Sequence, residues 1–199
     1  MMIASDNPAI FNGADLGAKA ERVNYQYLET VRRIVRSNPP ARQVGEALPA
    51  YGVLPDDVVQ WIVDSSLETL HSAAKCGQLL LGLRVSNASR LLNVSVRGAY
   101  DNEVFALNEA YFALAHAAVR AGLPGQLMLA LPADLFAALR QMTVFRAREV
   151  SRFPSVLVSL RAASAAQLTA LADGGQHARA YNALVQHLPA NLSNPLSLS

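Results

Sequence analysis

The sequence contains a single cysteine, Cys76, among 199 residues. One cysteine excludes an internal disulfide, and no set of cysteines and histidines has the spacing of a zinc site. No apolar run reaches the roughly 18 to 20 residues that a membrane-spanning helix needs. The first residues also lack the basic start and apolar stretch of a secretory signal. These absences predict a cytoplasmic protein without a structural metal or a membrane segment.

Lysine is nearly missing as well. Charged residues make up 16% of the chain, and its formal net charge is only +2. Of 17 basic residues, Lys19 and Lys75 are the lysines, and the others are arginine. The guanidinium of arginine binds phosphate and carboxylate through two parallel hydrogen bonds, for which lysine is less suited. A GC-rich genome also produces an excess of arginine over lysine. The charge alone does not indicate a nucleic-acid-binding protein.

Motifs that carry enzyme chemistry are missing too. The sequence has no P-loop, no GxGxxG and no GxSxG, and the pair Asp56-Asp57 is typical of a helix start. Lys75 stands beside Cys76, and its charge would lower the pKa of the thiol. The histidines lack partners at metal-binding spacing: His71, His116, His177 and His187. We therefore expect no enzyme activity and no cofactor.

Apolar residues, by contrast, are abundant, at 52% of the chain, and their spacing is helical. Val23, Tyr27 and Val31 lie four residues apart, which places them on one face of a helix beginning near Ala20. Proline and glycine separate this segment from further segments of the same kind. The pattern predicts an all-α fold with an aperiodic N-terminal arm over residues 1–21 and a polar, proline-broken tail over residues 189–199.

Two pairs of segments repeat in the same order. QLLLGLRV at residues 78–85 matches SVLVSLRA at residues 155–162, 77 positions later. The segment at residues 23–37 matches residues 107–121, 84 positions later. A first-half loop such as PAYGVLP accounts for the seven-residue difference. The repeats predict an internal duplication, with one helical unit over residues 22–100 and a second over residues 101–188.

Each unit resembles the FlhD family of flagellar transcriptional regulators. The resemblance lies in a helix that carries Asn-x-x-Tyr and ends in arginine, followed by a leucine-rich segment and a later arginine. The first copy contains Asn24, Tyr27, Leu28, Arg36, Leu67, Leu70, Ala73, Gln78, Leu79, Leu80 and Arg84. The second copy contains Asn108, Tyr111, Phe112, Leu114, Ala115, Arg120, Leu157, Leu160 and Arg161. The family normally has one unit in a shorter chain, and its cysteine after Gln-Leu-Leu is missing here, so its inter-subunit disulfide is not carried over.

The resemblance implies two tandem FlhD-like units packed about a pseudo-two-fold axis. It also implies a transcriptional regulator subunit that assists promoter binding and activation together with a zinc-containing, DNA-binding FlhC-like partner. Tethering the two units in one chain would make their association independent of protein concentration, because each unit meets the other at an effective concentration of order millimolar. A helical adaptor or scaffold with no DNA role is the alternative, and a homo-oligomer is compatible with both. We expect these leucines and valines to be buried: Leu67, Leu70, Leu79, Leu80, Leu83, Leu157, Val158 and Leu160.

Arginines are the candidates for DNA or partner contacts. Arg32, Arg33, Arg36 and Arg42 form the densest basic cluster, which is either a track for three or four phosphates or a solvated helix face. The segment at residues 86–102 is either a linker or a helix-turn-helix piece whose reading helix opens at Arg97. A further set favours surface charge or partner contact: Arg140, Arg146, Arg148 and Arg152. The DNA-binding or partner-binding candidates are Arg32, Arg33, Arg36, Arg42, Arg84, Arg90 and Arg97.

Overall fold

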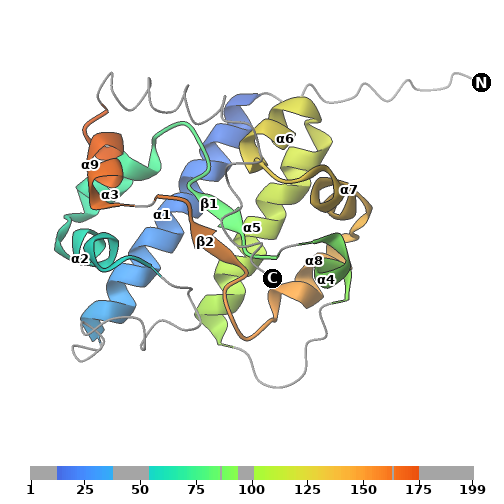
Figure 1. The fold of residues 1–199 in the computed structure, drawn as a ribbon, viewed down its shortest axis with the longest axis horizontal. Coiled ribbons are helices and arrows are strands. Elements are labelled where there is room, and N and C mark those ends of the chain that lie inside the picture. The colour runs from blue at the N-terminus through green and yellow to red at the C-terminus, as the bar shows by residue number, and fades with distance from the viewer. Residues whose placement is uncertain (1–12, 38–53, 86, 94–100, 163, 175–199) are drawn as a thin grey trace, which may run out of the picture.

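The computed structural model describes residues 13–37, 54–85, 87–93, 101–162 and 164–174 (Figure 1). Within these ranges the chain forms nine helices and two strands of three residues each. The expected all-α class is confirmed, with one short two-stranded ladder added to it. The expected packing of two units about a pseudo-two-fold axis stays a prediction.

The first half is built around one long helix. Its elements are α1 (Gly13–Ser37), α2 (Asp56–Asp64), α3 (Leu67–Ala74), β1 (Leu81–Leu83) and α4 (Ala88–Leu92). Both α2 and α3 pack against α1. Ser66 begins α3 by accepting a hydrogen bond from the backbone N–H of Thr69 at 3.0 Å, which satisfies one of the free donors of the first turn.

The second half has a corresponding order with one more helix. Its elements are α5 (Asn102–Arg120), α6 (Leu123–Leu129), α7 (Ala133–Gln141), α8 (Val144–Ser151), β2 (Val158–Leu160) and α9 (Ala165–Ala172). The helices α6, α7 and α8 pack against α5. Thr143 caps α8 by accepting from the N–H of Arg146 at 3.1 Å. Thr143 lies 77 positions after Ser66, which caps α3 in the same way.

The long helix α1 begins earlier than the sequence predicted. It starts at Gly13, so the expectation of an aperiodic arm over residues 1–21 is wrong from residue 13 onward. Leu16 and Ala20 are buried and extend the apolar face that continues with Val23. Their spacing of four and three residues is helical, and this continuation of the stripe was overlooked among the polar residues around it. Residues 1–12 lie outside the described ranges.

The two halves meet in the ladder of β1 and β2. The strands are antiparallel, and Gly82 stands opposite Ser159 at the centre of the register. The N–H of Arg84 donates to the carbonyl oxygen of Leu157 at 2.8 Å, and the N–H of Arg161 donates to that of Leu80 at 2.7 Å. The two donors, Arg84 and Arg161, are 77 positions apart, and so are the two acceptors, Leu80 and Leu157. The ladder therefore looks the same from either half.

The last helix of each half packs against the opposite half (Figure 1). Helix α9 lies against α2 and α3, and α4 lies against α7. The carboxylate of Asp57 accepts from the N–H of Ala165 at 2.8 Å, and that of Asp134 accepts from the N–H of Ala88 at 3.3 Å. A carboxylate at the start of a helix satisfies a free donor and complements the helix dipole. Each half thus supplies an acid that holds the last helix of the other half.

Most of the expected core is buried. Leu70, Leu79, Leu80, Leu157, Val158 and Leu160 are buried as expected. Two expectations are wrong, because Leu67 is 50% exposed and Leu83 is half-buried. Leu67 is the first residue of α3, while Leu70, Ala73 and Ala74 form the buried face of that helix. A leucine in a first helical turn can therefore stay in solvent although the rest of its helix is packed.

Candidate partner and nucleic-acid interface

The asparagine of the repeated motif connects the long helix of the first half to the start of β1. Asn24 is fully buried on α1. Its Nδ2 donates to the carbonyl oxygens of Ala74 at 3.2 Å and Gln78 at 2.8 Å. Its Oδ1 accepts from the N–H of Leu80 at 2.8 Å. One amide thereby binds three backbone groups at the turn between α3 and β1, where buried polar groups need hydrogen-bond partners.

The second half repeats this arrangement with Asn108 on α5. The Nδ2 of Asn108 donates to the carbonyl oxygens of Ser151 at 3.2 Å and Ser155 at 3.1 Å, and its Oδ1 accepts from the N–H of Leu157 at 2.8 Å. The two asparagines are 84 positions apart, and their backbone partners are 77 positions apart. These are the two offsets of the sequence repeats. We call these arrangements the asparagine clamps.

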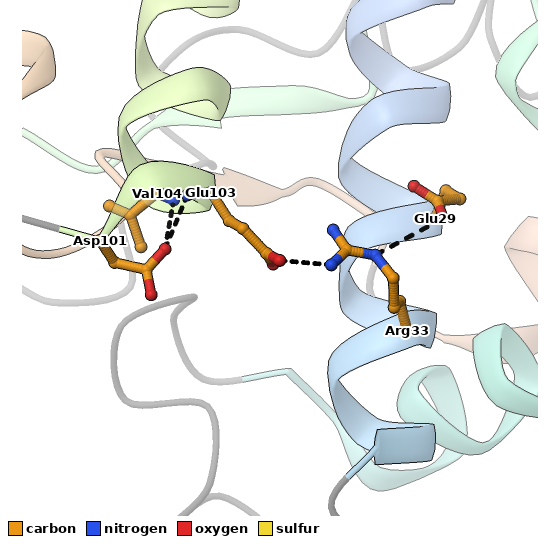
Figure 2. Close-up of polar contacts among 5 residues, drawn as sticks. All are labelled: Glu29, Arg33, Asp101, Glu103 and Val104. Carbon is orange, nitrogen blue, oxygen red and sulfur yellow. Dashed lines mark hydrogen bonds and ion pairs between the residues drawn. The ribbon is translucent and has the colours of Figure 1, made fainter.

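Arg33, the central member of the arginine cluster on α1, is held by two carboxylates. Its guanidinium pairs with Glu103 at the start of α5, and its Nε lies 3.7 Å from Glu29 one turn earlier on α1 (Figure 2). Asp101 fixes the position of Glu103, since its side chain accepts from the backbone N–H groups of Glu103 and Val104. About half of the Arg33 side chain remains exposed, so the pair contributes at most about 1 kcal/mol to stability.

The neighbouring arginines of this cluster also have internal contacts. The guanidinium of Arg36 donates to the carbonyl oxygen of Val63 at 2.6 and 3.2 Å. Val63 lies at the C-terminal end of α2, where a cation complements the helix dipole and caps a free carbonyl. Arg32 is half-buried, with its Nε enclosed. The three arginines share a stretch of α1, but Arg33 and Arg36 already bind protein groups.

The remaining candidates lie elsewhere. Arg84 follows β1, and its Nη1 donates to the carbonyl oxygen of Val156 at 3.2 Å. Arg90 is exposed on α4. Arg42 and Arg97, and with Arg97 the proposed reading helix, lie outside the described residues. Within the described ranges the structure therefore brings only Arg32, Arg33 and Arg36 together.

Cys76 differs from the sequence-based expectation. Burial raises the pKa of its thiol, while a hydrogen bond from the backbone of Gln78 acts in the opposite, weaker direction. Lys75 does not lower this pKa, because its ammonium points to Glu21, 3.9 Å away. The expectation of an activated thiol is therefore wrong.

We expect Cys76 to react slowly with iodoacetamide at pH 8, since the thiolate is the nucleophile and a raised pKa reduces its fraction. Mass spectrometry of the native and the urea-unfolded chain measures the two alkylation rates. Unfolding should accelerate the reaction about tenfold or more, because it removes the burial that raises the pKa and opens access to the sulfur. Equal rates would show that burial does not protect the thiol.

An exposed apolar pair at the start of α8 was missed by the sequence reasoning. Phe145 is 81% exposed and Val144 is 67% exposed. A helical wheel contains the signal for Phe145, because the buried residues Ala147 and Val150 lie on a face that Phe145 does not share. The sequence analysis made no prediction for Phe145, because its position on this wheel was not considered.

Within the described ranges, His, Cys, Asp and Glu side chains form no group of three or more that would suit a metal ion. None of the helices in the same ranges combines the length and apolarity of a membrane span. No family model matches this chain, and searches of curated proteins and of solved structures found no match.

Proposed function

We propose that the chain consists of two copies of one helical unit related by a two-fold axis that passes near the Gly82–Ser159 pair. The asparagine clamps support this proposal, because two independent sets of three hydrogen bonds keep the same atoms and the same sequence offsets. The central register of the ladder supports it too, since exchange of the halves returns the same pairing. Such an arrangement is a dimer contained in one chain.

On this basis we propose a cytoplasmic transcriptional regulator subunit of FlhD type, which assists promoter binding together with a zinc-containing FlhC-like partner. The resemblance depends on the Asn-x-x-Tyr motif, and the observation that supports the proposal most is that this motif has the same structural role in both halves. Asn24 and Tyr27 are fully buried in the first half, as are Asn108 and Tyr111 in the second. The motif thus has one structural role in both copies. DNA contact and activation follow from the resemblance.

The contacts of the arginines limit how this chain could contribute to promoter binding. Arg36 holds the end of α2, so its replacement acts on stability. Arg33 keeps an exposed guanidinium at the surface between α1 and α5 (Figure 2). A phosphate would compete there with Glu103 and Glu29 for the same group. We therefore assign any direct phosphate contact of the described cluster to Arg33 first, and base recognition to the partner.

The variant Arg33→Ala tests the DNA role. If Arg33 contacts one phosphate, the slope of log affinity against log salt should become shallower by about 0.9. The measurement is a fluorescence titration of promoter DNA at several salt concentrations. It uses the complex that the full chain forms on co-expression with a cysteine-rich, FlhC-like protein, isolated by gel filtration; such a protein is first sought among the products of neighbouring genes.

Arg22→Ala is the matched control, because Arg22 is exposed on the same helix outside the cluster. Its salt slope should equal that of the wild type. An unchanged slope for Arg33→Ala with an intact complex would remove Arg33 from the DNA interface. Loss of the complex at an unchanged slope would instead assign Arg33 to the contact with the partner protein.

A helical adaptor with no DNA role is the second candidate. The internal contacts of Arg33 and Arg36 favour it, since both groups serve to join helices of this chain. A chain that forms no complex with the FlhC-like protein and binds no promoter DNA would support the adaptor.

A further inference from the structure

The start of α8 and the end of α4 form an exposed apolar surface. Val144 and Phe145 lie in the first turn of α8, and Leu92, which is 38% exposed, ends α4. The guanidinium of Arg146 donates to the carbonyl oxygen of Leu92 at 2.6 Å and so joins the two helix ends. We call Leu92, Val144 and Phe145 the α4–α8 patch. Large apolar side chains gathered in solvent are typical of a surface that another molecule covers.

Basic side chains lie on α4 and α8, which carry this patch, and on α7, which packs against α4. Arg146 pairs with Glu149 at 2.6 Å, and Arg148 pairs with Glu109 at 3.5 Å. Arg90 is exposed on α4 two residues before Leu92, and Arg140 is exposed four residues before Val144. Four arginines therefore stand against three acids, namely Glu109, Glu149 and Asp134, whose carboxylate binds the first N–H of α4. The surface is apolar at its centre and positive at its rim.

The corresponding surface of the first half has a different character. Positions 77 residues earlier replace Phe145 by Glu68, Arg146 by Thr69 and Arg148 by His71. Val144 corresponds to Leu67, which leaves one exposed apolar residue there. The two halves keep the same internal clamps but not the same surface at these helix starts. A ligand of the α4–α8 patch would consequently bind once per chain.

We propose that the α4–α8 patch binds an acidic amphipathic helix of a partner protein, in a ratio of one helix per chain. The apolar face of such a helix, with side chains at spacings of three and four, covers Phe145 and Val144. Its Asp and Glu side chains meet the arginine rim. Interface centres are enriched in aromatic residues and in arginine, and a few such residues carry most of the affinity. The proposal concerns a surface other than Arg33 and does not depend on the DNA role.

A protein helix fits the patch better than nucleic acid does. The centre of the patch is aliphatic as well as aromatic, and Val144 and Leu92 offer no stacking plane for a base. A second copy of this chain would have to place the same positive rim against itself. An acidic partner avoids that repulsion.

Peptide selection tests the proposal. Random peptides displayed on phage are selected on the full chain, and peptides that also bind Phe145→Ala are removed. We expect the retained peptides to combine apolar residues at helical spacing with an excess of Asp and Glu. A synthetic, fluorescein-labelled retained peptide is then titrated by anisotropy. Phe145→Ala should weaken its binding about 30-fold, and Arg148→Ala should weaken it less and reduce its salt dependence.

Leu123→Ala is the matched control, because Leu123 on α6 is 67% exposed, like Val144. Its peptide affinity and the thermal unfolding of all three variants should match the wild type. The proposal is overturned if no peptide depends on Phe145, or if the dependent peptides lack acidic residues. It is also overturned if sedimentation shows a wild-type dimer that Phe145→Ala dissociates, or if a labelled single-stranded oligonucleotide binds with the same dependence on Phe145.

Discussion

Replacing Asn24 by alanine is expected to lower the free energy of unfolding by about 3 to 5 kcal/mol. The change removes three hydrogen bonds and leaves two carbonyls and one N–H without their partner at the turn between α3 and β1. A buried backbone group left unpaired costs about 1 to 3 kcal/mol, and a loss of this size is exceptional for a single substitution. Equilibrium unfolding in urea, followed by circular dichroism, gives the value.

Asn108→Ala should cost a similar amount, because Asn108 satisfies the equivalent groups in the second half. Asn93→Ala provides the control, since Asn93 is an exposed asparagine at the end of α4. It should change stability by less than about 0.5 kcal/mol. A loss below about 1 kcal/mol for Asn24→Ala would mean that water replaces the amide and that the clamp does not hold the turn.

A variant of nearly the same shape separates hydrogen bonding from packing. Asn24→Asp keeps the oxygen that accepts from the N–H of Leu80. It replaces the donating Nδ2 by a second oxygen, which faces the carbonyl oxygens of Ala74 and Gln78. Burial disfavours the charged form, so the pKa of this aspartate in the folded state lies above its unfolded value of about 3.9. The variant is therefore most stable at a pH below the unfolded pKa, where the aspartate is protonated in both states. This stability is lost as the pH rises through the folded pKa. The stability difference between Asn24→Asp and the wild type should therefore grow from pH 4 to pH 8.

The clamps also show what the sequence could and could not predict. The recurrence of Asn24 and Asn108 at equal places in a helix was visible as part of the repeat. Their role was not visible, because the groups that they bind are backbone atoms, and any residue type except proline at positions 74, 78 and 80 offers the same carbonyls and N–H. Sequence comparison within the chain thus located the two residues, and only the geometry explains why asparagine stands there.

The α5–α6 junction shows how one residue can serve two elements. Gly122, with its positive φ of 69°, ends α5 as a glycine after a helix commonly does. Pro124 belongs to the first turn of α6, where the backbone N–H that proline lacks has no partner within the helix. Gly125 then lets α6 approach α5 closely, since an added Cβ would lie 1.8 Å from the carbonyl oxygen of Ala118. Local rules predicted the stop but not the close packing, which depends on a partner helix.

Three arginines of the predicted cluster, Arg32, Arg33 and Arg36, share a stretch of α1, but their contacts depend on distant residues. Arg33 lies 70 positions from Glu103, and Arg36 lies 27 positions from Val63. Periodicity describes neighbours one or two turns apart and carries no information on such contacts. Phe145 shows the converse, because its exposure could have been deduced from the wheel of α8 alone. Local arguments therefore identified faces, and tertiary contacts decided which charges remain for a ligand.

Neither half of the chain is expected to fold as a stable monomer when the two are produced separately, as residues 1–96 and residues 97–199. Within the described ranges β1 pairs with β2 alone, so each separated half would expose one unpaired strand edge. Helix α9, including its fully buried Leu168, would lose the face of α2 and α3 that covers it. The N-termini of α4 and α9 would also lose the carboxylates of Asp134 and Asp57.

Mixing the separated halves should restore the helical circular dichroism and produce a 1:1 complex in gel filtration. Without the tether, the association of the halves depends on their concentration. Dilution from well above to well below the dissociation constant should therefore unfold the complex, whereas the intact chain should stay folded. The symmetric register offers one competing outcome, in which two copies of the first half pair through Gly82 and form a homodimer. Such a homodimer would still support the proposed two-fold relation of the units. Two cooperatively folded monomers would contradict it, because the exchange of α4 and α9 would then contribute nothing that each half needs.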